Sequence, residues 1–307
     1  MLRRAERRAV RTTSISTTKT NVFWNHDYTA ASYAFDTTRK SGDIARAIDA
    51  GRADVVIIDP SSHRERTLEL IRTVHDAIYV DAVLSGHPEH LASSQGFTWD
   101  SGIPTMAIAH SSGLVAAVTE VLSGSSRVAG SLSSGLHHAR AGTGRGYCTF
   151  NGLAVAAEAA LTAGAERILV LDLDAHGGGG TRSLSDPDRV VQIDVSTSGF
   201  DAWNPAPSDA YLFAGKDDYL TTIGEALDLA ARAGAFDLVL YNAGMDPVTD
   251  SGVSSQDIAV REQQVASWAE EHDLPLVYAL AGGYAHGGDA AREALVDLHL
   301  LTIQAFA

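Results

Sequence analysis

Residues 168–180 read ILVLDLDAHGGGG, an apolar segment that runs into four consecutive glycines. Alternate residues of an extended strand point to the same face of a sheet. The side chains of Asp172, Asp174 and His176 can therefore converge where the strand ends. Carboxylate oxygens and imidazole nitrogens are ligands that suit Zn²⁺ or a similar divalent ion. The stretch thus predicts a buried strand that ends in a metal site.

The rest of the chain alternates short apolar runs with longer amphipathic stretches. Nearly continuous β-branched and Leu-rich runs are typical of strands buried on both faces of a parallel sheet. This alternation predicts a three-layer α/β/α fold with a mostly parallel central sheet. Strands are expected at Val55–Ile58, Ile168–Asp172, Val190–Val195, Leu238–Tyr241 and Leu276–Leu280. Helices are expected at Glu65–Asp76, Thr105–Leu122, Asn151–Ala163, Asp217–Ala233, Ser255–Glu271 and Asp289–Ala305.

Residues 20–307 are interpreted as one domain, because no internal repeat or low-complexity linker follows residue 20. The Gly- and Ser-rich pieces 123–134 and 142–146 are short enough to be loops. Residues 1–19 are rich in Arg, Ser and Thr and are expected to form a disordered basic tail.

Composition excludes several classes of function. The formal charge is −15; residues 1–20 hold six basic residues and one acidic residue, so they carry +5 and the remaining chain −20. So acidic a body is a poor general binder of nucleic acid, and it could attract cationic substrates, although many enzymes are acidic for solubility alone. Cys148 is the only cysteine and cannot form an internal disulfide, which fits a reducing compartment. No apolar run approaches the roughly 18–20 residues of a membrane span, so a cytoplasmic protein is expected. The sequence leaves open whether the chain forms a homo-oligomer.

Polar residues follow three of the expected strands, at the edge where ligands bind in such sheets. Asp246 comes after the strand Leu238–Tyr241, and Gly282-Gly283-Tyr284 comes after Leu276–Leu280. Asp174, His176 and Asp246 would supply three protein ligands and leave one position open, which is the arrangement of catalytic zinc. A strand-end Asp that caps a helix, with an unrelated loop His, is the alternative.

Two further motifs offer proton donors and acceptors. His137 and His138 follow a Gly-rich loop and could serve as general base and general acid, with a pair of surface histidines as the alternative. Two glycines precede Tyr284 and would let its phenol reach into a cleft and donate to a developing oxyanion. A partly buried loop tyrosine is the alternative for that residue.

Four pieces of the chain resemble the histone deacetylase superfamily in order and approximate spacing. They are Gly135-Leu136-His137-His138-Ala139 with Gly146-Tyr147-Cys148-Thr149-Phe150-Asn151, then Asp172-Leu173-Asp174-Ala175-His176, then Gly244-Met245-Asp246, and then Gly282-Gly283-Tyr284. Val74–Val80 also looks like an earlier Val-His segment of that family, and the resemblance covers roughly residues 65–300. The superfamily includes acetylpolyamine amidohydrolases and has the arginase/deacetylase fold. The resemblance implies a zinc-dependent amidohydrolase that removes an acetyl or other short acyl group from acetyl-lysine, an acetylpolyamine or a small N-acyl metabolite.

The resemblance also implies a role for each matching residue. Asp174, His176 and Asp246 look like the ligands of one Zn²⁺. His137 and His138 look like the tandem active-site histidines, and Tyr284 looks like the tyrosine that polarises the scissile carbonyl. Asp172 would support His137 and, together with Ser196, help to bind a structural K⁺. The residues expected along the substrate channel are Tyr147, Trp203, Gly146 and Gly283.

The glycine run departs from the usual family pattern, Asp-x-His-His-Gly-Asn/Asp-Gly. Gly179 stands where a carboxylate or amide would orient His138, and such groups fix the tautomer and basicity of an imidazole. Either another residue or a water replaces this partner, or activity is weak. Weak activity would make the chain a deacetylase-like protein that binds acylated amines without turnover. Gly178 and Gly244 replace the extra carboxylates of a binuclear manganese ureohydrolase, which disfavours that activity.

Overall fold

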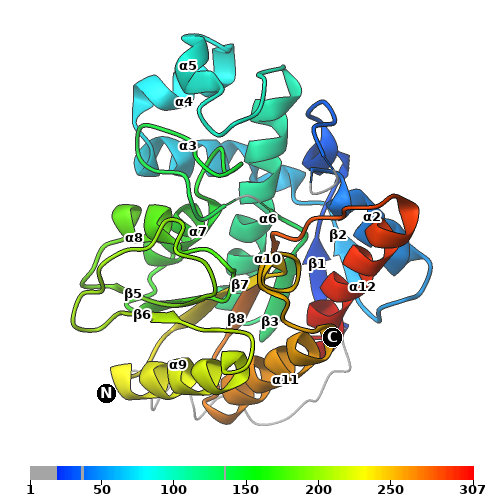
Figure 1. Cartoon of the computed structure of the whole chain (residues 1–307). Helices are drawn as coiled ribbons and strands as arrows, with labels where there is room; N and C mark the ends of the chain where they lie inside the picture. The colour runs from blue at the N-terminus through cyan, green and yellow to red at the C-terminus, as the bar shows by residue number, and fades with distance from the viewer. Residues whose placement is uncertain (1–18, 36–37, 135) are drawn as a thin grey trace.

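An eight-stranded parallel sheet forms the centre of the molecule, with strand order β2-β1-β3-β8-β7-β4-β5-β6 (Figure 1). The structure is a computed structural model that describes residues 19–35, 38–134 and 136–307. The predicted basic tail therefore lies outside the described residues, except for Lys19. The strands are β1 (Asn21–Phe23), β2 (Val56–Ile58), β3 (Val128–Ser131), β4 (Ile168–Asp172), β5 (Val190–Ser196), β6 (Ala210–Phe213), β7 (Leu238–Gly244) and β8 (Leu276–Ala281).

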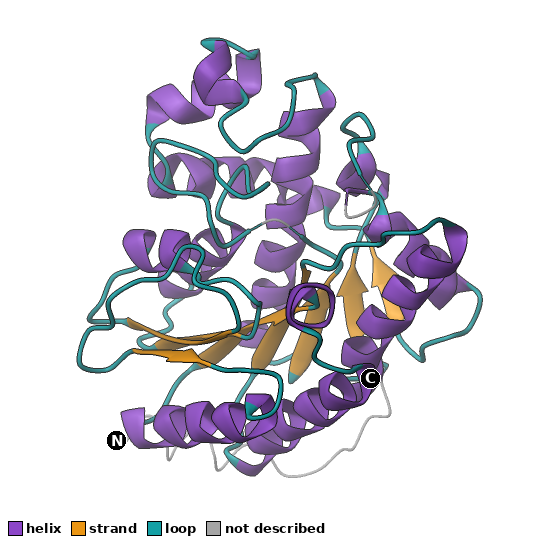
Figure 2. Ribbon diagram, viewed as in Figure 1, coloured by secondary structure: helices purple, strands orange, loops and turns teal. Residues whose placement is uncertain are grey.

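Helices cover both faces of this sheet and produce two hydrophobic cores (Figure 2). Strand β4 contributes to both, because Leu169 and Leu171 face one core while Ile168 and Val170 face the other. The first core contains α2 (Lys40–Asp49), α9 (Tyr219–Ala233), α11 (Ser255–Glu271) and α12 (Asp289–Ala305). The second contains α3 (Arg64–Val74), α4 (Ala77–Ser85), α6 (Gly102–Ser123) and α7 (Gly152–Thr162). This arrangement confirms the predicted three-layer α/β/α fold. The shorter helices are η1 (His26–Thr29), η3 (Ser61–His63), α5 (Glu89–Ala92), α8 (Gly179–Leu184) and α10 (Asp246–Ser251).

All five expected strands are present, but the expectation that residues 123–134 form a loop is wrong. That segment contains β3, whose sequence Val-Ala-Gly-Ser lacks a bulky apolar run. A side chain at Gly130 is excluded by the neighbouring strand, because a Cβ there would lie 2.1 Å from Cζ of Tyr278. Small residues in β3 therefore reflect packing against β8, which local sequence cannot reveal.

Helix α6 corrects another expectation, that no apolar run approaches the length of a membrane span. It is 22 residues long and contains an 18-residue window with a mean hydropathy of 1.3. In the structure, 78% of that window is buried, and α6 packs against α3, α7 and β3. Its apolar composition is therefore accounted for by its position inside the protein.

The loops after four neighbouring strands meet at one edge of the sheet. Strands β3, β8, β7 and β4 lie side by side, and the carboxyl ends of parallel strands share an edge. The loop after β3 carries His137 and His138, and the segment after β4 carries Asp174. Asp246 follows β7, and Tyr284 follows β8. The topology thus brings together residues from four distant parts of the sequence.

A buried ion pair holds two of these strand ends from behind. Arg261 and Glu262 of α11 have 0% side-chain exposure, and their charged groups lie 2.5 Å apart. Arg261 also donates to the backbone oxygen of Gly244 at 2.7 Å and to that of Leu173 at 3.3 Å. These two carbonyls lie just before the segments that carry the aspartates of the β7 and β4 ends. The guanidinium therefore fixes the separation of the two segments.

Replacing Arg261 with methionine is expected to lower the free energy of unfolding by about 3–5 kcal/mol, because Glu262 would stay buried without its counter-charge. The hydroxyls of Tyr241 and Thr302 still donate to Glu262, at 2.9 and 3.1 Å, but they do not neutralise it. The double variant Arg261→Met/Glu262→Met should recover much of the loss, since it removes both charges. Urea unfolding measures these free energies, and a single variant as stable as the parent would contradict the assignment.

Candidate active site

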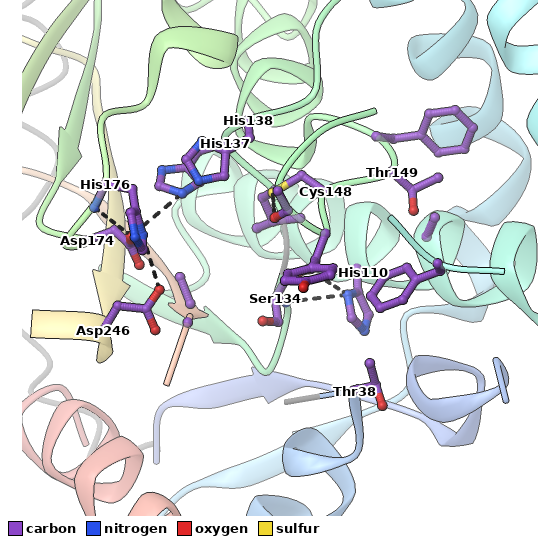
Figure 3. Close-up of a pocket in the computed structure, with 18 of the residues that line it drawn as sticks. Thr38, His110, Ser134, His137, His138, Cys148, Thr149, Asp174, His176 and Asp246 are labelled. Carbon is purple, nitrogen blue, oxygen red and sulfur yellow. Dashed lines mark hydrogen bonds and ion pairs between the residues drawn. The ribbon is translucent and has the colours of Figure 1, made fainter. Parts of the chain in front are cut away.

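Asp174, His176 and Asp246 lie together at one end of a cavity (Figure 3). One potential ligand atom from each residue lies within 4.8 Å of the other two. His176 Nδ1 lies 3.1 Å from Asp174 Oδ1 and 3.3 Å from Asp246 Oδ2. Both carboxylates are almost completely buried. Two carboxylate oxygens and an imidazole nitrogen converge here, which is a three-ligand donor set suited to catalytic zinc.

The two aspartates give this end of the cavity a strong negative potential. Burial favours a neutral imidazole, but the two carboxylates outweigh it and raise the pKa of His176 to about 10. Burial, together with the charge of Asp174, raises the pKa of Asp246. The remaining ring nitrogen of His176, Nε2, lies 3.3 Å from Asp250 Oδ2. A carboxylate behind a histidine fixes its ring so that the other nitrogen faces the ligand position, so the residues present fit a divalent cation.

Asp172 lies behind His137, where the sequence places it. His137 Nδ1 donates to Asp172 Oδ2 at 2.8 Å, and Asn242 Nδ2 donates to the other carboxylate oxygen at 2.8 Å. Burial opposes the charged imidazole, but the charge and hydrogen bond of Asp172 prevail and raise the pKa of His137 to about 9. His137 therefore favours the imidazolium form.

His138 has a carboxylate partner from a different segment of the chain. Its Nδ1 donates to Asp201 Oδ2 at 3.0 Å, and Asp201 lies in the loop between β5 and β6. Burial, and then the nearby charge of His137, lowers the pKa of His138 to about 4. The two imidazole rings are 3.9 Å apart, yet their environments favour opposite protonation states, the usual basis for dividing acid and base roles. Another residue thus occupies the position of the partner that Gly179 lacks.

The glycine run makes room for the loop that carries Asp201. A Cβ at Gly177 or at Gly179 would lie 2.6 Å from the backbone oxygen of Asp201. Asp201 itself has a φ of 55°, in the left-handed region that glycine favours and that Asn and Asp adopt more often than other residues. Strain of this kind persists only where surrounding contacts impose it. A side chain at position 179 and the observed position of Asp201 are therefore mutually exclusive.

The cavity has a volume of about 240 Å³, and the surface of its wall is more apolar than polar. The Phe200 ring meets the rings of His138 and His176 edge-on, with centroids 4.9 and 5.7 Å apart. Tyr147 is 42% exposed and packs against Phe35, with ring centroids 4.7 Å apart. The wall also includes Phe97, Met106, Gly146, Gly282 and Tyr284.

Two of the residues expected along the channel lie elsewhere. The Trp203 indole N–H donates to Oδ2 of buried Asp194 at 2.6 Å, so this side chain is drawn away from the cavity. Phe200, from the same loop, occupies the wall instead. Gly282 lines the cavity in place of Gly283, whose backbone N–H donates to Asp246 Oδ1. Tyr147 and Gly146 do lie in the wall.

Lys40 supports the loop that carries Tyr284. Its buried ammonium donates to the carbonyl oxygen of Gly282 and lies 3.2 Å from His299 Nε2. The N–H of the same peptide unit, which belongs to Gly283, donates to Asp246. Both glycines have positive φ, 55° and 81°, which glycine adopts without steric cost. Lys40 and Asp246 thus hold one peptide unit from its two sides, directly before Tyr284.

The expected K⁺ site stays a prediction. Ser196 ends β5 and is fully buried, while both oxygens of Asp172 already accept hydrogen bonds from His137 and Asn242.

The sequence does not predict Asp250, Asp201 or Lys40 as residues of the site. Asp250 lies four residues after Asp246, a helical spacing that could have indicated it. The loop that contains Asp201 departs from the family pattern, and the missing side chain at Gly179 is the only signal of a substitute. Nothing in the sequence around Lys40 indicates a link to the distant glycine pair.

A model of the histone deacetylase domain matches residues 33–200, more than half of the chain. The chain belongs to the histone deacetylase family. His137, His138, Asp174 and His176 lie inside the matched range, while Asp246 and Tyr284 lie beyond it.

Known relatives agree with this membership, and a solved structure shares the fold. Histone deacetylase 2 of Arabidopsis thaliana is 32% identical over 167 residues, which cover 50% of this chain and 43% of that protein. Acetylpolyamine amidohydrolase 2 of Pseudomonas aeruginosa is 28% identical over 231 residues, which cover 64% of this chain and 65% of that protein. The crystal structure of acetylpolyamine aminohydrolase from Burkholderia pseudomallei matches with a TM-score of 0.73 at 18% identity, over 94% of this chain and 98% of that one. The likeness confirms the arginase/deacetylase-like fold, and the chain spans less than half of the Arabidopsis relative.

Replacing Gly179 with alanine is expected to destabilise the protein by about 1–3 kcal/mol, because the new methyl group collides with the Asp201 backbone. Gly199→Ala is the matched control, because Gly199 lies in the same loop as Asp201 but has space for a side chain. Apart from its chain neighbours, no described atom lies within 4 Å of a Cβ placed at Gly199. The control should stay within about 0.5 kcal/mol of the parent. Urea unfolding measures both variants, and equal stabilities would show that the loop does not rest on the glycine run.

Proposed function

We propose that the chain is a zinc-dependent deacetylase that hydrolyses the amide of an acylated amine and releases acetate or another short acid. One observation carries the proposal: a single cavity contains both the Asp-His-Asp set and two histidines, each with its own carboxylate. Membership of the histone deacetylase family supports the same reaction.

Asp174, His176 and Asp246 would hold the zinc ion. Bound there, zinc would supply Lewis acidity toward the substrate carbonyl and the attacking water. A binuclear manganese centre finds no support, because the positions for further carboxylates are blocked. A Cβ at Gly244 would lie 2.3 Å from Asp174 Oδ2, and one at Gly178 would lie 2.7 Å from Asp172 Oδ2.

The histidines divide the proton transfers between them. The pKa of His138 is low and its Nδ1–H donates to Asp201, so Nε2 would accept a proton from the attacking water. Asp172 raises the pKa of His137, whose imidazolium form would stabilise the negative charge that develops on the substrate. A protonated histidine then donates to the nitrogen of the leaving amine, so that the amine departs neutral.

Tyr284 would bind the carbonyl oxygen of the substrate. It lines the cavity, and burial raises the pKa of its phenol, so the hydroxyl stays protonated at neutral pH. A phenol that donates to the oxygen stabilises the tetrahedral state more than the planar amide. Lys40 and Asp246 restrict the peptide unit before this residue.

The alternative of a protein that binds acylated amines without turnover rests on the missing partner of His138. Asp201 supplies that partner, so the feature that favours the alternative is gone.

The proposed activity is tested with zinc-loaded protein on three classes of substrate: acetyl-lysine peptides, acetylpolyamines and small N-acyl amines. Release of acid should occur with at least one class. Asp246→Ala removes a ligand, and its turnover should fall to background. No turnover above that of Asp246→Ala on any substrate would refute the deacetylase proposal.

Tyr284→Phe should lower kcat by about 10²–10³-fold, because the lost hydrogen bond forms mainly in the transition state. The phenylalanine ring keeps the packing against Phe35, and bound zinc, measured by atomic absorption, should not change. A kcat equal to that of the parent would remove Tyr284 from the mechanism.

A further inference from the structure

The Asp201 carboxylate forms hydrogen bonds with two side chains, those of His138 and Arg140. One oxygen, Oδ2, accepts from His138 Nδ1 at 3.0 Å and from the Gly180 backbone N–H at 3.2 Å. The other oxygen, Oδ1, accepts from Arg140 Nη2 at 2.5 Å. Arg145 is more distant, with its Nη1 3.4 Å from Oδ1. Both carboxylate oxygens are therefore engaged, and each faces a different group.

Arg140 contacts both the Asp201 side chain and the backbone of the glycine run. Its Nη2 reaches Asp201, while its Nη1 donates to the backbone oxygen of Gly179 at 3.2 Å. The planar guanidinium spans these two acceptors in one fixed geometry, which the single nitrogen of a lysine cannot reproduce. Arg140 thus ties the Asp201 side chain to the backbone of the glycine loop.

The Asp201 carboxylate has 1% side-chain exposure, so water does little to hold it in place or to stabilise its charge. Its own backbone is in the left-handed region, so local conformation does not favour the observed position. A buried carboxylate in this setting depends on its charged partners for both orientation and ionisation, and Arg140 is the nearer of its two arginines. His137 differs, because its Asp172 is held by the neutral amide of Asn242.

We propose that Arg140 is a positioning residue of the deacetylation reaction, which fixes the Asp201 carboxylate so that it orients the His138 imidazole. This inference rests on the proposed deacetylase function. It assigns to Arg140, two residues after the tandem histidines, a role that acts only through Asp201.

A double-mutant cycle on kcat tests this dependence. Arg140→Met and Asp201→Asn should each lower kcat of the zinc-loaded enzyme by about 10–100-fold, the usual effect of losing an orienting partner. The kcat of the double variant should lie within about twofold of that of the slower single variant. Both changes break the same chain of contacts, from Arg140 through Asp201 to His138. Arg140→Lys should retain an intermediate kcat, since it keeps a cation near Asp201 but loses the bridge to Gly179.

Arg182→Met is the matched control for structural damage. Arg182 of α8 forms a similar pair with Asp209, at 2.7 Å, with side-chain exposures of 14% and 1%. Its other hydrogen bond goes to the backbone oxygen of Ser185, away from His138. Its loss should reduce stability but leave kcat within about threefold of the parent. A kcat loss in Arg182→Met equal to that in Arg140→Met would overturn the proposal, as would multiplicative losses in the cycle or an Arg140→Met variant with the parent's kcat.

A second measurement is independent of turnover. Nitrogen-15 NMR of labelled histidines reports the tautomer of His138, which should carry its proton on Nδ1 in the parent and become mixed in Arg140→Met and Asp201→Asn. Arg182→Met should keep the parental spectrum. An unchanged His138 tautomer in Arg140→Met would refute the positioning role, whereas absence of turnover in all variants would bear on the proposed function alone.

Discussion

The packing of the loop around Asp201 against bare glycine backbone is the contact on which the rest of the site depends. It places a carboxylate behind His138 from position 201, whereas the family pattern has an Asn or Asp at position 179. The 2.6 Å approach that a Cβ would make to the Asp201 oxygen leaves space for glycine alone at positions 177 and 179. The glycine run that first suggests a missing catalytic partner is therefore the means by which another partner reaches the site.

Each buried charge around the cavity forms a hydrogen bond or an ion pair with a specific partner. Asp172 accepts from a neutral amide, and its charge raises the pKa of His137. Asp201 pairs with Arg140, while burial and the charge of His137 lower the pKa of His138. Behind the ligands, Arg261 fixes the ends of β4 and β7. Paired buried charges of this kind specify one arrangement of the site, because breaking any pair leaves an uncompensated charge.

The parts of the site that lie on regular elements could be predicted from the sequence. The period of a strand places Asp172 and Asp174, and the parallel sheet brings Asp246 and Tyr284 to the same edge. Strand β3 could not be predicted, because its glycine at position 130 is required by packing against the Tyr278 ring on another strand. The loop at 198–203 has no periodicity, so the sequence could not show that Phe200 enters the cavity wall while Trp203 turns to Asp194, nor that Asp201 meets His138.

A crystal structure of the zinc-soaked protein, with anomalous data at the zinc edge, tests the central claim most directly. We expect one anomalous peak per chain in contact with Asp174, His176 and Asp246, and the Asp201 carboxylate hydrogen-bonded to His138. Two metal peaks in the cavity, zinc bound elsewhere, or an Asp201 side chain turned away from His138 would contradict the claim.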